Sequence, residues 1–503
     1  MVRKASTLLL SASLLLSACV SWQAEPLPAG PSQADPSAAP STSSTTTTIA
    51  GPVTALVVVD AEAAPIAGVS VGDFGHTDAG GRLVFRTPIG GVTLDADGYV
   101  SRFVSDWQEG EVQVTLEPVI VRGMVRTSAG DGLEGVPVAL GGLEVLTDGS
   151  GWFEFIAPTG SAIRVDAPGW APAEVEWLGS DGWVPIELEP IIVRGLHISG
   201  WAVGNADHWQ RILALAAATE INALVVDLKD ESGLVFYPTT VPLAGEVGAI
   251  NPEFELDGVV AAAARRGLYL IGRIVTFQDP IAARALPEIA VWDSSTGGPF
   301  RKNGQYFLDP TDPEARGYAL ELAAEACAAG FDEIQFDYVR YPDGFGASAL
   351  FDAGSGPEVR PSIIRDFLAE ASAVLRPAGC AVAADIFGFI TSTSGDGGIG
   401  QQLEDLGPVV DVLSPMLYPS HYSEGWFGFD VPNDHPGEVV GRALDDGLER
   451  LDSTAIFRPW IQDFYYNAAQ VRAEIDAAEE RGLGWMLWNA RSRFTDGALL
   501  PAD

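Results

Sequence analysis

Three aspartates in the C-terminal three-fifths of the chain stand inside or directly after short apolar runs. They are Asp337, Asp385 and Asp463. An acid inside an apolar strand costs free energy unless it has a partner or a purpose. Hydrolysis of a glycosidic bond typically uses two carboxyl groups, one ionised and one protonated. We therefore take these three residues as candidate catalytic carboxylates.

The expected roles of the three aspartates differ because their sequence surroundings differ. Asp337 is the candidate nucleophile or charge stabiliser, since Arg273 and Arg340 could hold it ionised. Asp385 is the candidate acid/base. Asp463 is its rival, and otherwise a third carboxylate that orients the substrate. The alternative for each is a structural role, because aspartate at a strand end often stabilises a turn or caps a helix.

Further polar and aromatic side chains follow the same apolar runs and are predicted to bind substrate. They are Asp227, Lys229, Asp230, Arg273, Tyr338, Arg340, Tyr341, Tyr418, His421, Trp460, Trp488 and His197. Aromatic rings present flat apolar faces that can stack on a pyranose, although packing in the core or rim is an equal alternative. We expect the two histidines to position groups by hydrogen bonds rather than to act as catalysts.

The elements that must position these residues begin near residue 195, where strands alternate with amphipathic helical stretches. The predicted strands are Leu196–Ser199, Ala223–Leu228, Tyr269–Val275, Glu333–Tyr338, Ala381–Phe387, Val412–Leu417, Ile456–Ile461 and Gly484–Leu487. Eight such strands predict an α/β fold, the (β/α)8 TIM barrel, whose active sites lie at the C-terminal strand ends. A doubly wound sheet is the alternative, but no Gly-rich phosphate loop follows the first strand.

An internal repeat precedes the barrel. The run Leu116–Gly123 recurs as Leu188–Gly195, and Thr77-Asp78 recurs as Thr147-Asp148. Short β-branched and aromatic runs separated by turn residues predict a small all-β sandwich for each copy. The expected fold is therefore multidomain, with sandwich repeats at residues 52–122 and 123–194 and the barrel at 195–503.

The first 51 residues predict a targeting segment and a tether. Residues 1–18 have a positive start and the apolar stretch Leu8–Ala18, which is too short to span a bilayer. The run Leu16–Cys19 resembles the lipobox of bacterial lipoproteins, which implies a lipoprotein signal peptide and an acylated Cys19. The alternative is an ordinary secretory signal with an incidental cysteine. Residues 19–51, rich in Pro, Ala, Ser and Thr, predict a disordered tether. We expect an extracytoplasmic protein held to the cell membrane through Cys19 only.

The charge and the cysteine content limit which partners and cofactors are expected. The chain has 29 Lys and Arg against 68 Asp and Glu, a net charge of −39. Such a surface repels phosphate backbones, so no nucleic-acid partner is expected. Neither the histidines nor the cysteines show metal-ligand spacing, and we predict no metal and no cofactor. Cys327 and Cys380 each precede a predicted strand, and whether they form a disulfide or stay buried thiols is left open.

The barrel runs resemble a known bacterial family named "putative glycosyl hydrolase domain", distantly related to α-amylase-like barrels. The resembling runs are Arg194–His197, Val226–Asp230, Phe336–Pro342, Asp385–Gly388 and Ser414–Tyr422. The relationship implies a nucleophilic Asp on strand four, a Glu acid/base on strand five and a supporting Asp on strand seven. Asp337, Asp385 and Asp463 occupy these strand ends, although the residue on strand five is one methylene shorter than Glu.

The repeats resemble carboxypeptidase-regulatory-like domains, which implies spacers or stabilisers, with carbohydrate binding as the alternative. The expected function is that of a lipid-anchored, extracytoplasmic glycoside hydrolase acting on a cell-envelope or environmental polysaccharide or oligosaccharide. The alternative is a non-catalytic glycan-binding barrel that serves as an envelope adhesion or scaffold module. Cleavage of an ester or amide on a sugar is a third reading, but no Gly-x-Ser-x-Gly elbow or metal cluster supports it.

Overall fold

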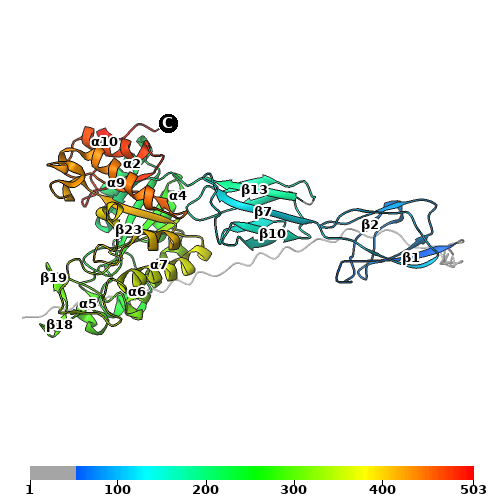
Figure 1. Cartoon of the computed structure of the whole chain (residues 1–503), viewed down its shortest axis with the longest axis horizontal. Coiled ribbons are helices and arrows are strands. Elements are labelled where there is room, and N and C mark those ends of the chain that lie inside the picture. The colour runs from blue at the N-terminus through cyan, green and yellow to red at the C-terminus, as the bar shows by residue number, and fades with distance from the viewer. Residues whose placement is uncertain (1–51, 181, 503) are drawn as a thin grey trace, which may run out of the picture. The chain divides into compact units, whose positions relative to one another are not determined.

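The C-terminal part of the chain forms a closed barrel of eight parallel strands (Figure 1). The computed structural model describes residues 52–180 and 182–502. The barrel strands are β14 (Arg194–Ile198), β15 (Ala223–Lys229), β16 (Tyr269–Val275), β21 (Glu333–Asp337), β23 (Ala381–Phe387), β24 (Val412–Leu417), β25 with β26 (Ile456–Phe457 and Trp460–Gln462) and β27 (Trp485–Trp488). The sheet closes because β14 pairs with both β15 and β27, and β23 pairs with β24.

The seventh strand is split into β25 and β26, and both pieces pair with β24. The break falls at Arg458-Pro459, where proline offers no backbone N–H to a ladder. The predicted TIM barrel is therefore confirmed, and each of the predicted strands overlaps an observed one.

Helices alternate with the barrel strands. The longer ones are α2 (Ala206–Ala218), α4 (Leu256–Ala264), α6 (Pro313–Ala329), α7 (Arg360–Leu375), α9 (Pro436–Arg450) and α10 (Ala468–Glu479), and the shorter ones are α1 (Gly200–Gly204), α3 (Pro242–Glu246), α5 (Ala282–Ala285) and α8 (Leu403–Leu406). Local sequence sets both ends of α6. The Asp312 side chain accepts hydrogen bonds from the first free N–H groups, and Gly330 closes the helix with φ 106°.

Loop insertions between these elements carry short strands. They are β17 (Trp292–Asp293), β18 (Gly298–Pro299), β19 (Arg301–Lys302), β20 (Gln305–Tyr306) and β22 (Ala349–Leu350).

The interior of the barrel is polar at successive levels of β21. Side chains alternate along a strand, so Glu333, Gln335 and Asp337 point to the same side. Glu333 accepts from Arg458 at 2.8 and 3.0 Å, and Gln335 donates to Ser414 Oγ at 3.1 Å. Asp337, at the C-terminal end, completes the series at the level where a barrel carries its active site.

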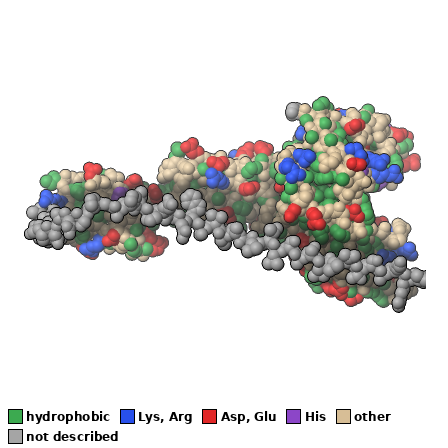
Figure 2. All heavy atoms as spheres, turned by 180° about the vertical axis from the view of Figure 1, so that it is seen from behind, with side chains coloured by type: hydrophobic (Ala, Val, Ile, Leu, Met, Phe, Trp, Pro, Cys, Tyr) green, Lys and Arg blue, Asp and Glu red, His purple; other side chains and the backbone are tan. Residues whose placement is uncertain are grey.

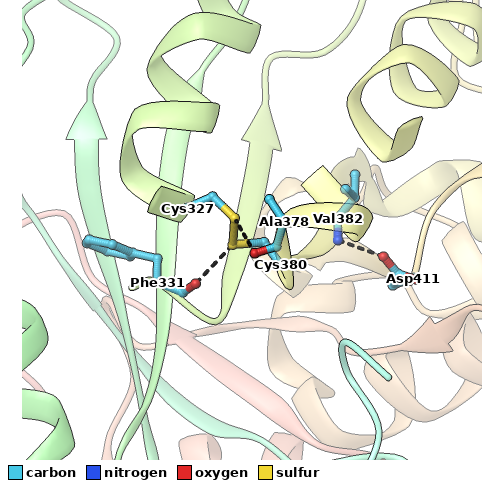
Figure 3. The surroundings of a disulfide bond; sticks show 6 residues. All are labelled: Cys327, Phe331, Ala378, Cys380, Val382 and Asp411. Atoms are coloured by element: carbon cyan, nitrogen blue, oxygen red, sulfur yellow. Dashed lines mark hydrogen bonds between the residues drawn. A yellow bond between two sulfur atoms is a disulfide. The ribbon is translucent and has the colours of Figure 1, made fainter. Parts of the chain in front are cut away.

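The two cysteines of the barrel form a disulfide (Figure 3). Cys327 lies in the last turn of α6 and Cys380 directly before β23, with their Cα atoms 6.0 Å apart. The start of β23 is held further by the backbone N–H of Val382, which donates to Asp411 Oδ2 at 2.7 Å. The pairing that the sequence left open is thus present, and it ties α6 to β23.

The region before the barrel contains several small sheets. Its strands are β1 (Val53–Val59), β2 (Ser70–Val71), β3 (Arg82–Arg86), β4 (Val92–Asp95), β5 (Arg102–Val104), β6 (Gly110–Thr115), β7 (Ile120–Thr127), β8 (Pro137–Leu140), β9 (Leu143–Leu146), β10 (Trp152–Ile156), β11 (Ala162–Val165), β12 (Ala173–Glu176) and β13 (Gly182–Leu188). The sheet orders are β3-β1-β6 and β2-β4-β5, then β10-β7-β13 and β12-β11-β8-β9. Each pair of sheets contributes to one hydrophobic cluster, and the description as two sandwiches stays a prediction.

The internal repeat is visible in individual hydrogen bonds. Thr77 Oγ1 accepts from Val69 N, and Thr147 Oγ1 accepts from Val136 N, both at 2.9 Å. Asp78 and Asp148 each accept two backbone N–H groups of the following turn. Equivalent residues of the two copies therefore make the same hydrogen bonds to the neighbouring backbone.

Acidic side chains (red) are spread over the small sheets and over the barrel on the face drawn in Figure 2. Within residues 52–180 and 182–502, no helix has both the length and the apolar character needed to cross a bilayer. The expectations for the signal peptide, Cys19 and the tether lie outside the described residues.

Candidate active site

A cavity of about 570 Å³ lies at the C-terminal ends of the barrel strands. Of the residues predicted from sequence, its lining includes Arg273, Asp337, Tyr338, Arg340, Tyr418, His421, Trp460 and Trp488. These side chains come from strands far apart in the chain, and closure of the barrel brings them together. The position agrees with the place where barrels of this kind carry their active sites.

Arg273, on β16, is fully buried and organises the acidic groups. Its Nε and Nη2 donate to Asp337 Oδ2 at 3.1 and 2.5 Å, and its Nη1 donates to Asp227 Oδ1 at 2.7 Å. Burial alone would lower the pKa of Arg273, but the charges of Glu231, Asp227 and Asp337 raise it well above its usual range. The guanidinium thus stays charged and donates two hydrogen bonds to Asp337.

Glu231 is a carboxylate of this cavity that the sequence analysis did not select. It follows β15, in a turn where Asp230 Oδ1 accepts from the backbone N–H of Ser232 at 2.9 Å. Its Oε1 accepts from Arg273 Nη2 at 2.6 Å, and 33% of its side chain is exposed. Asp337 accepts from the same nitrogen, so the two bonded oxygens lie no more than about 5.1 Å apart, the two hydrogen bonds laid end to end.

Asp385 is close to the same cluster but does not line the cavity. Its Oδ1 accepts from Trp460 Nε1 at 2.8 Å, and its Oδ2 lies 3.9 Å from Arg273 Nε, with no hydrogen-bond partner among the described residues. Burial, followed by the charge of Asp337, raises the pKa of Asp385 well above its usual range. Asp385 therefore retains its proton to higher pH than an ordinary aspartate.

His197 and Asp227 support the cluster from the side. His197 Nε2 lies 3.0 Å from Asp227 Oδ2, and its ring stacks on Trp488 with centroids 3.9 Å apart. Burial alone would raise the pKa of Asp227, but the charges of His197 and Arg273 hold it below its usual range. Trp488 in turn lies 4.8 Å from the Arg273 guanidinium, which fixes this wall of the cavity.

The opposite wall contains a strained residue and a second cation. Tyr338 directly follows Asp337 and has φ 49°, a conformation that bulky residues rarely adopt. The guanidinium of Arg340 lies between the rings of Tyr338 and Phe387, 4.9 and 4.4 Å from their centroids. Burial lowers the pKa of Arg340, and its nearest acid, Asp343, is 3.5 Å away.

Seven of the predicted site residues do not line the cavity. Three of them, His197, Asp227 and Asp385, contact the acidic cluster as described above, and the other four have separate partners. Lys229 pairs with Asp279 at 3.0 Å, and Tyr341 donates to the backbone of Gly354. Asp463 accepts from the hydroxyl and N–H of Thr495 at 2.6 and 2.8 Å, and burial raises its pKa. Asp230, as described above, stabilises the turn that carries Glu231.

Most of the cavity residues that sequence reasoning missed are aromatic or lie in loops. Besides Glu231, they are Phe387, Gly388, Phe389, Met416, Tyr422, Ser423 and Trp426. Glu231 and Tyr422 stand at or next to the ends of runs that drew attention, and proximity to a strand end was the available signal. Trp426 lies in a 3-10 turn nine positions beyond the end of β24, where no periodic pattern points to the barrel rim.

No group of three or more His, Cys, Asp or Glu side chains within residues 52–180 and 182–502 is arranged to hold a metal ion. Three acids around Arg273 instead accept hydrogen bonds from its guanidinium. Their arrangement suits chemistry in which a positive charge develops next to a carboxylate.

Comparison with known proteins identifies relatives of the barrel. A sequence model of the family described as "Putative glycosyl hydrolase domain" matches residues 195–494. A hypothetical protein from Ruminiclostridium thermocellum ATCC 27405 is 39% identical, with 38% of this chain and 96% of that one covered and a TM-score of 0.35.

Two solved structures of glycoside hydrolase domains are also similar to the barrel. The domain of PgaB (BpsB) from Bordetella bronchiseptica is 14% identical, covers 60% of this chain and 95% of its own, and has a TM-score of 0.44. For the domain of PelA from Pseudomonas aeruginosa these values are 11%, 61%, 97% and 0.37. No curated protein matches the chain.

Proposed function

Because this chain belongs to the family described as "Putative glycosyl hydrolase domain", we propose that its barrel hydrolyses a glycosidic bond of a polysaccharide or oligosaccharide. One observation carries the proposal. Two carboxylates, Asp337 and Glu231, reach the same aromatic cavity and share one nitrogen of Arg273. Retaining glycosidases place their two carboxyl groups roughly 5–5.5 Å apart and inverting ones roughly 6.5–9.5 Å. An upper limit of about 5.1 Å between the bonded oxygens favours the class with the shorter separation.

In this mechanism Asp337 attacks the anomeric carbon while the bond to the leaving oxygen breaks. Two hydrogen bonds from Arg273 orient the Asp337 carboxylate, and Glu231 gives a proton to the leaving oxygen. Water then transfers a proton back to Glu231 and its oxygen to the anomeric carbon, which releases Asp337. Trp460, Trp488 and Tyr418 offer flat faces for the sugar rings.

Glu231 suits the acid/base role better than the two aspartates chosen from sequence. Its Oε2 makes no hydrogen bond to a described residue, whereas Asp463 is occupied by Thr495. Asp385 holds a proton but lies beneath Trp460, outside the cavity lining. We assign it a supporting role, in which a neutral Asp385 avoids a second negative charge next to Asp337.

We also propose that the protein works outside the cytoplasm, on a cell-envelope or environmental polysaccharide, and is anchored through an acylated Cys19. The lipobox-like run at Cys19 and the Cys327–Cys380 disulfide support this location, because disulfides persist in oxidising compartments. The two repeats before the barrel, proposed as β-sandwiches at residues 52–122 and 123–194, would hold the barrel at residues 195–503 away from the membrane.

The test compares wild type with Glu231→Gln and Asp337→Asn in the full-length chain. On a panel of polysaccharides, both variants should lose activity, by on the order of 10²–10⁴-fold for the acid. On 4-nitrophenyl glycosides the leaving group needs no proton, so Glu231→Gln should keep bond cleavage while Asp337→Asn loses it. Asp463→Asn is the matched control and should stay close to wild type.

Other outcomes would reassign the site. Loss of activity in Asp463→Asn together with retention in Glu231→Gln would return the acid/base role to Asp463. Binding of glycans without product release by the wild-type chain would favour the non-catalytic glycan-binding barrel.

A further inference from the structure

The second repeat carries two tryptophans on one face of a sheet, away from the barrel cavity. Trp152 on β10 and Trp183 on β13 lean toward each other over the central strand β7, with ring centroids 5.3 Å apart and planes at 41° (Figure 1 labels the three strands). Trp183 is 53% exposed, although tryptophan is usually among the more buried residues. Trp152 is half-buried. Exposure of an indole ring such as that of Trp183 costs free energy in water, and packing within the sheet does not explain it.

The first repeat provides an internal comparison for these two positions. Arg82 on β3 lies opposite Val57 and Glu111 on β6 lies opposite Ala55, with β1 between them. In the second repeat, Trp152 lies opposite Met124 and Trp183 opposite Arg122 in the same pattern. The backbone N–H groups of Arg82 and Trp152 also donate to equivalent aspartates, Asp78 and Asp148.

The first repeat fills the two equivalent positions with an ion pair. Arg82 and Glu111 lie 2.7 Å apart across the same strand diagonal. The fold of the repeat therefore does not require aromatic rings at these positions. An exposed ion pair, which contributes little to the free energy of unfolding, occupies them in the first repeat. The second repeat therefore carries a tryptophan pair that its fold does not require.

The charges on this face indicate the chemistry of its ligand. The chain as a whole carries −39, but the outward-facing charged residues of β7, β10 and β13 are two arginines and two glutamates. They form the pairs Arg122–Glu154 at 2.7 Å and Arg126–Glu187 at 3.5 Å. The face is thus neutral and offers flat apolar rings beside polar groups, which complements a neutral polymer with hydroxyl groups and apolar C–H faces.

We propose that Trp152 and Trp183 form a binding site for a neutral polysaccharide chain, separate from the barrel cavity. Pyranose rings stack on the two indoles, and the flanking Arg122–Glu154 pair offers hydrogen bonds to hydroxyl groups. The choice of a glycan as ligand rests on the proposed function, whereas the location of the site rests on the comparison between the repeats.

The experiment measures binding of the full-length protein to insoluble chitin, cellulose and β-1,3-glucan. The central variant is Trp152→Arg/Trp183→Glu, which installs the ion pair of the first repeat on an equivalent scaffold and so should fold. Its affinity for the polymer that the wild type binds should fall by about tenfold or more, as expected for loss of two aromatic anchors. The control variant Arg82→Ala/Glu111→Ala should bind like wild type.

Further arms separate this proposal from its alternatives. Asp337→Asn should keep the binding that depends on the tryptophans, so a failure of the hydrolase proposal leaves this result intact. Absence of wild-type binding to all three polymers, or equal binding by the tryptophan double variant, overturns the inference. Binding to phosphatidylcholine vesicles that is lost in the double variant also overturns it, in favour of a membrane-contact face.

Discussion

At the scale of single residues, the active-site proposal depends on how four acids share one buried guanidinium. Asp227, Glu231 and Asp337 accept hydrogen bonds from Arg273, and Asp385 lies 3.9 Å from it. One positive charge does not balance four negative ones, so the most deeply buried acid with the fewest partners takes up a proton. Asp385 fits that description, and a neutral Asp385 places no additional negative charge beside Asp337.

The raised pKa of Asp385 makes a prediction about pH. In the unfolded chain this carboxyl ionises near its ordinary value, about 3.9, whereas burial in the folded chain keeps it protonated to higher pH. The folded state therefore binds more protons, and stability falls as pH rises from that ordinary value toward the raised one. Asp385→Asn resembles the neutral acid and removes this dependence.

Melting temperatures at pH 5 and pH 8 test the prediction. The decrease between the two pH values should be smaller in Asp385→Asn than in wild type, and at pH 8 the variant should be at least as stable. Glu449→Gln, which changes an exposed acid on α9, is the control and should keep the wild-type dependence. A wild-type protein whose stability rises over this range by more than that of Asp385→Asn would contradict a neutral Asp385.

At the scale of elements, local sequence patterns gave the barrel strands and the longer helices, because apolar periodicity and caps such as Asp312 act over a few residues. The candidate site was predicted only in part. Asp337 and Arg273 were found because they interrupt buried strands. Glu231 was not selected because it follows its strand in a turn. Asp463 was selected although it lies outside the cavity lining, because its partner, Thr495, is 32 positions away. Contacts of that range are set by barrel closure, which no local pattern encodes.

The buried ion pair inside the barrel predicts an effect on stability. Arg458 and Glu333 are both fully buried, so Glu333→Gln leaves a charged guanidinium without its counter-ion. We expect a loss of about 3–5 kcal/mol in the free energy of unfolding. Calorimetry of the barrel transition measures it, and the double variant Glu333→Gln/Arg458→Met should recover much of the loss. A single variant as stable as wild type would argue against a charged pair at this level.

The disulfide predicts a second effect on the barrel. It joins α6 to β23 across 53 residues, and a cross-link of that span restricts the unfolded chain by about 4 kcal/mol in the chain-entropy account. Cys327→Ser/Cys380→Ser should therefore lower the denaturation midpoint of the barrel. A reducing agent should have the same effect on wild type and none on the variant. Equal midpoints for oxidised and reduced wild type would contradict a structural cross-link.

At the scale of the whole molecule, two proposed glycan contacts on one chain should matter most when the substrate is a polymer. A second contact raises the effective concentration of the substrate near the cavity, provided that one polymer reaches both sites. Trp152→Arg/Trp183→Glu should then raise KM for an insoluble polysaccharide severalfold and leave kcat/KM for a 4-nitrophenyl glycoside unchanged. Equal loss on both substrates would point to a damaged barrel instead.

The acidity of the chain bears on how it is held at a membrane. A net charge of −39 is repelled by anionic headgroups, and the described residues contain no helix suited to spanning a bilayer. In the anchor proposed at Cys19, each buried CH₂ of the acyl chains contributes about 0.8 kcal/mol to membrane attachment. Cys19→Ser should move the protein from the detergent phase to the aqueous phase in Triton X-114 partitioning and abolish palmitate labelling. Cys380→Ser, which removes a different cysteine, should leave both unchanged.

A Cys19→Ser protein that stays in the detergent phase would mean that another surface carries the attachment, and the neutral tryptophan face of the second repeat would be the next to test.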